Sequence, residues 1–329
     1  MPDRLSEFEF IARYLAPLAG EGAYGLTDDA ASIAPPAGQD LVLSTDMLSA
    51  GTHFFPDDPA GAIARKALRV NLSDLAAKGA KPLGFLLGLA LPGDWSEPWL
   101  AAFCDGLRHD VGHFDVPLLG GDTVGTRGIL TISITVLGLV PAGAMLRRTT
   151  AQAGDRIFVS GTIGDAALGL KARLDPAAGW LAALAADERA FLLERYLLPR
   201  PRLALAEGAR RHARAGMDVS DGFVGDLRKM LAGAGVGATV ALDKVPLSQA
   251  ASAAVAAAPD LFETALTGGD DYELLLAIPA GEAEAFRAAA RAADIAVTEV
   301  GTVTADPVIH FVAADGADRA FARGSYLHF

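Results

Sequence analysis

Short polar clusters that contain aspartate recur along the chain beside Ser, Thr, Asn or Gly. Each cluster alone is explained by a helix cap or a turn, where Asp, Ser and Gly are common. Taken together, their carboxylate and hydroxyl oxygens, without His or Cys, are the ligands that Mg²⁺ prefers. If the clusters converge, they predict a pocket in which several Mg²⁺ ions bind a polyphosphate that bare carboxylates would repel. The clusters are Asp28-Asp29, Ser44-Thr45-Asp46, Asn71-Leu72-Ser73-Asp74, Gly120-Gly121-Asp122-Thr123, Asp218-Val219-Ser220-Asp221-Gly222 and Gly268-Gly269-Asp270-Asp271.

Asp74 is the cluster residue that most needs a partner. In a helix over residues 59–78, Asp74 follows Ile63, Ala67 and Val70 on one stripe at spacing i, i+4, i+7 and i+11. An unpaired carboxylate on an apolar face costs several kcal/mol or takes up a proton. A lysine, an arginine or a metal ion shared with the other clusters would stabilise it. The same helix has a separate polar sector, made of Arg65, Lys66, Arg69 and Ser73.

The motifs that the sequence lacks also bear on the reaction. There is no GxxxxGK[ST], no HRD with DFG, and no GxGxxG between a strand and a helix, so a P-loop, a protein kinase and a Rossmann site are not indicated. No positioned general base stands out either. A phosphate oxygen, whose second pKa is about 6, is already ionised at neutral pH and needs no base. We therefore expect transfer to a phosphate acceptor, through charge neutralisation and in-line alignment.

The elements that must position these clusters follow a mixed α/β pattern. Helices are expected over residues 5–18, over 59–78 with Gly79 ending the helix, and from Asp165, while Pro199-Arg200-Pro201 interrupts a later helical region. The strand over 41–46 is expected to be short and buried, with Asp46 at its end. A domain boundary is expected within 141–155, a segment rich in Gly, Ala, Arg and Thr. Further strands are expected over 85–90, 117–119, 129–140, 156–160 and 272–278.

Length, charge and cysteine content narrow the class of protein. The chain has 329 residues and a net charge of −12, so two domains of about 150 residues each are expected. The negative charge argues against a nucleic-acid partner or an anionic membrane surface. No signal peptide and no apolar run of about 18 residues is found, which predicts a cytoplasmic protein. A single cysteine, Cys104, excludes a disulfide framework and a Cys-based zinc site, and we expect it to be a small buried hydrophobe.

The order and spacing of the clusters resemble those of the thiamine-monophosphate kinase family, which is part of the PurM-like (aminoimidazole ribonucleotide synthetase) superfamily. The resemblance runs almost end to end, and the joint pattern is far more specific than any one stretch. The stretches that carry it are LTDDAA (26–31), STDMLSAGTHF (44–54), KALRVNLSDLAAKGAKP (66–82), LLGGDTVGTRG (118–128), DRIFVSGTIGDAALGL (155–170), LPRPR (198–202), MDVSDGFVGDL (217–227) and GGDDYELLL (268–276).

The resemblance implies an activity and an architecture. The family transfers the γ-phosphate of ATP directly to thiamine monophosphate, with several Mg²⁺ ions, giving thiamine diphosphate and ADP. The implied fold is a two-domain PurM-like α/β (α+β) fold. Residues 1–145 would form the domain for ATP and Mg²⁺ binding and for dimerisation, with a sheet that pairs with that of a second subunit to make a barrel. Residues 146–329 would form a C-terminal α/β domain that closes the site of the homodimer.

The resemblance also implies roles for particular residues. ATP contacts are expected from Gly121, Asp122, Arg148 and Ser220, and acceptor contacts from His53, Asp270 and Tyr326. The fork of Arg148 suits neutralisation of the transferring phosphoryl oxygens. Residues expected to act directly in the transfer are Asp46, Asp74, Asp122 and Arg148. The implied metal ligands are Asp29, Ser44, Thr45, Asp46, Asp74, Asp122, Asp218 and Asp221.

The chain departs from the family pattern at three places, none of which removes a metal ligand. Thr27 stands where GIGDDAA of the family has its second glycine, Asp270 stands where GGEDYE has glutamate, and about two extra residues follow Thr123, near Val124-Gly125.

Other interpretations of the function stay open. Another PurM-like ATP enzyme, such as a selenophosphate synthetase or a carbamoyl dehydratase of hydrogenase maturation, would need a reactive cysteine at one terminus. A non-catalytic nucleotide- or metal-binding module, or clusters that are plain caps and turns, are the remaining alternatives.

Overall fold

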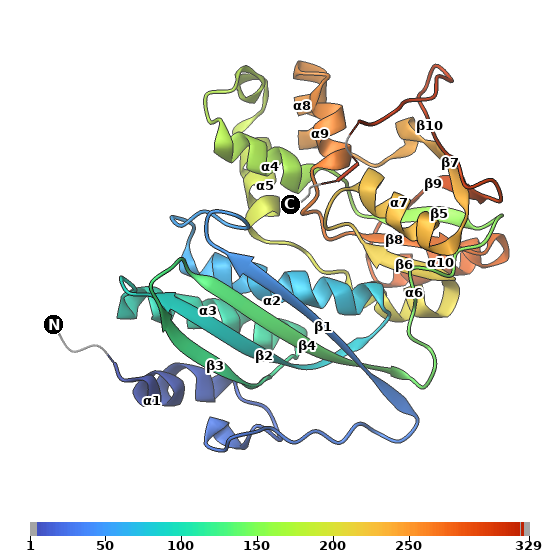
Figure 1. Cartoon of the computed structure of the whole chain (residues 1–329). Coiled ribbons are helices and arrows are strands. Elements are labelled where there is room, and N and C mark those ends of the chain that lie inside the picture. Colours follow the sequence, from blue (N-terminus) through green and yellow to red (C-terminus); the bar gives the residue numbers. More distant parts are fainter. Residues whose placement is uncertain (1–4, 323, 326–329) are drawn as a thin grey trace. The chain divides into compact units, whose positions relative to one another are not determined.

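The computed structural model describes residues 5–322 and 324–325 and divides into two compact units. The first unit runs up to Leu75 and continues over Lys81–Gly143, and the second contains Ala76–Ala80 and the chain from Ala144 onward. Helices and strands alternate in both (Figure 1), so the mixed α/β class is confirmed. Among the residues described, no helix is both long and apolar enough to span a membrane.

The first unit is built on a four-stranded sheet in the order β1-β4-β2-β3, with β2 and β3 parallel and the other neighbours antiparallel. Helices α2 (Ala60–Ala77) and α3 (Glu97–Phe114) cover one face of this sheet (Figure 1). As expected, α2 ends before Gly79, which has a φ of 69°. The strands are β1 (Gln39–Ser49), β2 (Lys81–Pro92), β3 (Leu118–Thr126) and β4 (Thr131–Pro141).

Strand β1 differs from the expected short buried strand over 41–46. Its alternation continues to Ser49, with Val42 and Leu48 buried and Met47 exposed, and it pairs with β4 along its whole length. Asp46 therefore lies inside the strand, opposite Ile134, and not at its end. The apolar run alone suggested burial on both faces, whereas the period of two leaves one face of the strand uncovered.

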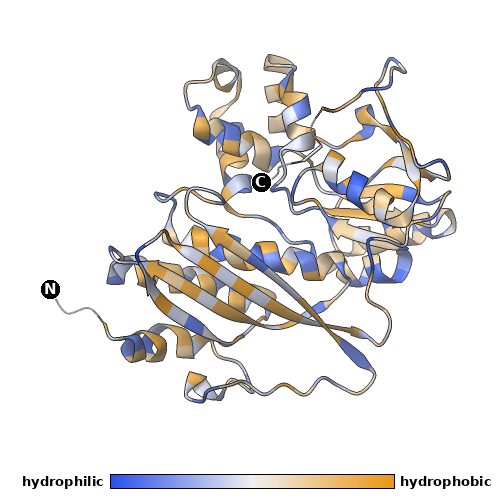
Figure 2. Cartoon of the chain, in the orientation of Figure 1, coloured by the Kyte–Doolittle hydropathy of each residue, from blue (hydrophilic) through white to orange (hydrophobic). Residues whose placement is uncertain are grey.

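The uncovered face of this sheet, here called the open face, is rich in apolar side chains. Cross-strand partners share a face, and the register joins Met47 to Ser133, Gly88 and Asp122 in one row across the four strands. Figure 2 shows hydrophobic and polar residues alternating along these strands. The large exposed apolar residues on the open face are Leu43 (59% exposed), Met47 (60%), Leu86 (39%) and Val124 (48%).

Before the sheet, the chain forms a run of short helical turns that replaces the single helix expected over 5–18. Ser6 caps α1 (Glu7–Phe10), and a π-helical turn (Ile11–Leu15) and a 3-10 turn (Ala16–Leu18) follow directly. Proline in this last turn has no N–H to continue the α-helical ladder. A further short turn, Tyr24–Leu26, precedes the Asp28-Asp29 cluster.

Buried charges join helices α2 and α3 of the first unit. Asp110 of α3 is fully buried and accepts hydrogen bonds from Arg69 Nε at 2.6 Å and from Arg65 Nε at 3.1 Å. Two arginines of the polar sector of α2, Arg65 and Arg69, therefore pair with α3. These guanidinium groups lower the pKa of Asp110 against the effect of its burial. Cys104 is also buried, as expected, and burial raises the pKa of its thiol to about 12, which leaves it an unreactive core residue.

The second unit is built on a six-stranded sheet in the order β10-β7-β9-β5-β8-β6. Helix α7 packs in one apolar cluster with Ile157, Val159 and Leu275, and α6 and α10 pack in another with Phe158 and Leu276. Since neighbouring residues of a strand point to opposite faces, these helices cover the two faces of the sheet. The strands are β5 (Arg156–Ser160), β6 (Ala215–Asp218), β7 (Gly237–Ala241), β8 (Leu274–Ile278), β9 (Val297–Thr304) and β10 (Ile309–Val312).

Two of the expected points in the second unit agree with its helices. α4 starts at Asp165, and the Pro199-Arg200-Pro201 break separates α5 from α6. Helices α4, α5, α8 and α9 share an apolar cluster of their own. The helices are α4 (Asp165–Leu174), α5 (Ala186–Leu197), α6 (Ala206–His212), α7 (Phe223–Ala234), α8 (Gln249–Ala257), α9 (Leu261–Thr267) and α10 (Ala283–Ala292).

Candidate active site

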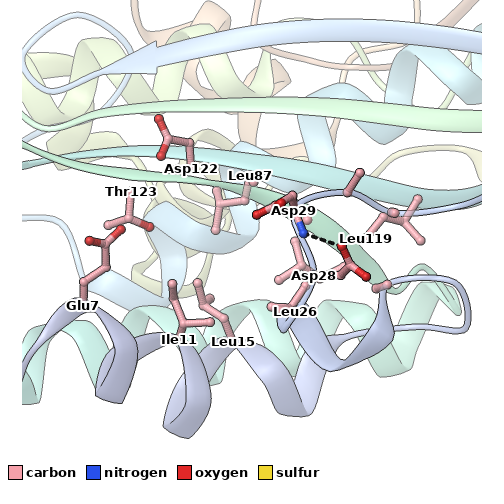
Figure 3. A pocket seen from close by; sticks show the side chains of 16 residues that line it. Glu7, Ile11, Leu15, Leu26, Asp28, Asp29, Leu87, Leu119, Asp122 and Thr123 are labelled. Carbon is pink, nitrogen blue, oxygen red and sulfur yellow. Dashed lines mark hydrogen bonds between the residues drawn. The ribbon is translucent and has the colours of Figure 1, made fainter.

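A cavity of about 260 Å³ in the first unit brings two of the aspartate clusters together. It is lined by Asp28, Asp29 and the β3 residues 120–123, and α1 and the turn after it form the opposite wall (Figure 3). The backbone N–H of Asp29 donates to Asp28 Oδ1 at 2.7 Å. Asp28 thus caps the turn, and both aspartates line the cavity. In Figure 3 the side chain of Asp122 points away from the helix that carries Glu7.

The backbone beside this cavity explains why position 121 is glycine and why position 27, where the family has glycine, can be threonine. Gly121 needs to be glycine because an added Cβ would lie 1.9 Å from the carbonyl oxygen of Leu87. Thr27, in contrast, has a φ of −106°, which any residue can adopt, and its hydroxyl donates to the Tyr24 carbonyl at 2.7 Å. The left-handed φ values fall earlier, at Tyr24 (50°), Gly25 (64°) and Leu26 (58°). The threonine therefore causes no backbone strain next to Asp29.

A second group of candidates lies where β1 faces α2. Ser44 Oγ donates to Asp74 Oδ2 at 2.5 Å, and the backbone N–H of Asp46 donates to Asn71 Oδ1 at 2.8 Å. The partner that Asp74 needs is thus supplied in part by a hydroxyl group. Thr45 points to the open face instead, where its hydroxyl accepts from Thr135 Oγ1 at 3.0 Å. The structure therefore brings Ser44 to Asp74 and places the side chain of Thr45 on the other side of the sheet.

Asp122 and Asp46 do not meet within one chain. Asp122 lies on β3 and Asp46 on β1, which are the opposite edges of the sheet. The row from Asp122 to Met47 crosses three strand spacings, or about 14 Å at ~4.8 Å each. The side chain of Asp46 also faces α2, whereas that of Asp122 is on the open face. Within the parts of the chain that the structure describes, no group of three acidic, His or Cys side chains could hold a metal ion.

In the second unit, Asp218 and Asp221 flank the entry to α7. Asp218 ends β6 and is 7% exposed. The carboxylate of Asp221 accepts from Lys229 Nζ, which also donates to Asp226 Oδ1 at 2.9 Å. Asp226 is fully buried, and this burial raises the pKa of its carboxyl group. The sequence analysis missed Lys229, although its i, i+3 spacing from Asp226 was a usable signal.

Replacing Lys229 with methionine is expected to destabilise the protein by about 1–2 kcal/mol, because the buried carboxylate of Asp226 loses its cation. The partial exposure of Lys229 keeps the expected effect below that of a fully buried pair. Urea unfolding would measure it as a lower midpoint, and Lys229→Arg, which keeps the charge, is the matched control. An unchanged midpoint in the methionine variant would contradict this role of Lys229.

The remaining candidates are placed as follows. Asp270 lies beside Ser220, because its N–H donates to the Ser220 carbonyl at 2.8 Å. His53 is half-buried in the turn after β1, where its Nδ1 accepts from the N–H of Ser49 at 3.0 Å. Arg148 is exposed. Tyr326 lies outside the described residues. Asp29, Ser44 and Asp74 are thus placed in the first unit and Asp218, Ser220, Asp221 and Asp270 in the second.

Comparison with known protein families shows the class of protein to which this chain belongs. The family model for AIR synthase related protein, N-terminal domain, matches residues 27–140, and that for its C-terminal domain matches residues 152–313. The fold and the aspartate clusters therefore define a two-domain protein of the AIR synthase related class. Thiamine-monophosphate kinase of Caulobacter vibrioides is 43% identical over 301 residues, which are 90% of this chain and 83% of that protein. The chain belongs to the thiamine-monophosphate kinase family.

Solved structures agree with this assignment. The crystal structure of thiamine-monophosphate kinase from Stenotrophomonas maltophilia aligns with a TM-score of 0.81 at 39% identity, over 89% of this chain and 91% of that one. A structure described as AaThiL complexed with AMPPCP and TMP aligns over 100% of both chains, with a TM-score of 0.78 at 27% identity. The PurM-like fold that the resemblance implied is confirmed.

Proposed function

We propose that this protein transfers the γ-phosphoryl group of ATP to thiamine monophosphate, giving thiamine diphosphate and ADP. The alignment over the full chain with a relative whose structure is described as complexed with AMPPCP and TMP carries this proposal. The site chemistry agrees with it, because the candidate residues are oxygen ligands suited to Mg²⁺ and a polyphosphate. The acceptor phosphate is ionised at neutral pH, so the lack of a positioned general base is no obstacle.

Magnesium fits this donor set in chemistry, although among the residues that the structure describes no three acidic, His or Cys side chains lie close enough to hold a metal ion. When bound, Mg²⁺ would neutralise the phosphate charges and orient the transferring group. Gly121, Asp122, Arg148 and Ser220 would contact ATP, with Arg148 offering its fork to the phosphoryl oxygens. His53 and Asp270 would contact the acceptor, together with Tyr326 outside the described residues. The residues that would hold magnesium are Asp29, Ser44, Thr45, Asp46, Asp74, Asp122, Asp218 and Asp221.

The working form is proposed to be a homodimer joined through the open face. Two observations support it. Large apolar side chains are exposed on that face, Met47 at 60% and Leu43 at 59%, and exposed apolar patches favour association. In addition, Asp122 and Asp46 lie on opposite edges of one sheet, so the proposed ligands on these two strands do not come together within one copy of this sheet. Domain 1–145 would then serve ATP and Mg²⁺ binding and dimerisation, and domain 146–329 would close the site. A cytoplasmic location stays a prediction.

The direct test is a product assay. Purified protein is incubated with MgATP and a panel of phosphate monoesters that includes thiamine monophosphate, and the nucleotide and acceptor products are separated. We expect ADP and thiamine diphosphate in equal amounts and little product from the other acceptors. Slow ADP release with no phosphorylated acceptor would overturn the kinase proposal and favour a nucleotide-binding module.

A further inference from the structure

A buried ionic cluster in the second unit is not explained by the proposed ligand contacts. Its centre is Glu273, whose side chain is fully buried. Arg202 donates to Glu273 through Nε at 2.6 Å and through Nη2, and Arg195 Nη2 donates to Glu273 Oε1 at 3.2 Å. Ser160 Oγ adds a bond to Oε2 at 2.6 Å. The LPRPR stretch thus supplies one of two arginines that hold a single carboxylate.

This cluster is attached to the segment that carries Asp270. Arg195 Nη2 also donates to the backbone carbonyl of Asp271 at 3.1 Å. The side chain of Asp271, fully buried as well, accepts from the N–H of Gly164 at 2.8 Å. Glu273 follows two residues after Asp271. The side chains of Asp271 and Glu273 are therefore anchored in the interior, and the Tyr272 hydroxyl between them donates to Asp270 Oδ1 at 3.3 Å.

The anchored loop has an unusual backbone. Asp270 has a φ of 64° and Tyr272 a φ of 53°, and neither is glycine. Residues with a side chain in the left-handed region are uncommon and energetically unfavourable, so they persist only where the surroundings impose the conformation. The N–H groups of Asp270 and Tyr272 donate at 2.8 Å to the carbonyls of Ser220 and Val219. The loop thereby joins the proposed acceptor residue to the proposed ATP-binding residue.

A cluster of this kind is hard to explain by stability alone. Burying charges removes their hydration, and a buried ion pair is often no more stable than apolar residues of the same volume. An Arg fork that holds a carboxylate in two hydrogen bonds does, however, fix geometry. The packing is also tight, because a Cβ on Gly161 would lie 2.3 Å from Glu273 Oε1 and 2.6 Å from Arg202 Nη2.

We propose that Arg202 is a positioning residue for the acceptor: by clamping Glu273 it holds residues 270–272 in their left-handed conformation and aims Asp270 at thiamine monophosphate. This inference rests on the proposed function. It assigns a role to the LPRPR stretch without direct contact between Arg202 and either substrate. Release of the clamp lets the loop relax toward ordinary backbone angles, which moves the carboxylate of Asp270 away from the acceptor.

The test compares Arg202→Met with Arg202→Lys and with Arg200→Met. Arg200 lies in the same LPRPR stretch, but its ion pair with Glu194 is exposed on both sides (44% and 51%). For Arg202→Met we expect KM for thiamine monophosphate to rise about tenfold or more, with KM for ATP changed less than about twofold. Lysine should restore part of the acceptor affinity, and Arg200→Met should behave as wild type.

A double-mutant cycle that combines Arg202→Met with Asp270→Ala distinguishes a positioning role of Arg202 from a general structural role. If Arg202 acts through Asp270, adding Arg202→Met to Asp270→Ala leaves KM for the acceptor unchanged. Equal rises in both KM values, or full additivity in the cycle, would overturn the inference. If Arg202→Met does not fold, Arg202→Lys and Ser160→Ala undergo the same comparison. An inactive wild type would refute the proposed function instead, so the two failures are distinguishable.

Discussion

Asp74→Asn is expected to abolish turnover, with kcat lowered by at least about 100-fold. Asp74 lies against β1, where Ser44 Oγ donates to its Oδ2 at 2.5 Å, and we propose it as a magnesium ligand. Asparagine keeps the shape of the side chain but removes its negative charge, so the hydrogen bond to Ser44 can persist while a hard cation loses a ligand. The measurement is kcat with saturating thiamine monophosphate, repeated over a range of Mg²⁺ concentrations.

The matched control for this variant is Asp105→Asn. Asp105 also lies on a helix of the first unit, but its side chain is 68% exposed and pairs with Arg108. Exposed pairs of this kind contribute little to stability, so activity and thermal midpoint should both stay at wild-type values. Wild-type turnover in Asp74→Asn would remove Asp74 from the metal site. A thermal scan of each variant shows that any loss of activity is not a loss of fold.

Met47→Asp is expected to convert a dimer into a monomer and to lower kcat at least about tenfold. Met47 is 60% exposed on the open face, and a carboxylate buried in an apolar interface without a partner costs several kcal/mol, or about a thousandfold in association. Activity should fall with the dimer, because one chain keeps Asp122 and Asp46 on opposite sheet edges. Light scattering after size exclusion gives the mass, and activity is measured at the same protein concentration.

Leu174→Asp controls for the loss of an exposed apolar side chain. Leu174 is 66% exposed at the end of α4 in the second unit, outside the open face. This variant should keep both the mass and the activity of the wild type. A wild-type protein that is monomeric and fully active at assay concentration would refute the homodimer, whatever the behaviour of Met47→Asp.

Local patterns predicted the elements of this fold well where the pattern was strong. The helix over 59–78 and the strand over 156–160 agree with α2 and β5, because both depend on the spacing of apolar residues and on a glycine stop. The predicted extent of β1, residues 41–46, was wrong. An apolar run shows that a strand exists, but whether it continues depends on the partner strand, and here β4 pairs with it as far as Ser49.

The candidate site was predicted in its residue types and less well in its partners. Asp74 was expected to need a partner, yet Ser44 lies 30 residues away in the chain, and nothing in the local sequence joins them. The ionic cluster shows the same limit, since Arg195 and Glu273 are 78 residues apart. Hydrogen bonds of this kind depend on how α5 and the residue before β8 come together, which no local period encodes.

The sequence by itself determined which residues can carry the chemistry: aspartates beside Ser and Gly, no P-loop, and a spacing that matches one family, because side-chain type and motif order are properties of the chain alone. Only the tertiary structure decided how these residues are grouped. It put Asp29 and Asp122 on one cavity, Ser44 on Asp74, and Asp46 on the far edge of the sheet from Asp122. Strand order and register follow from pairing between distant segments, and that pairing sets which carboxylates meet.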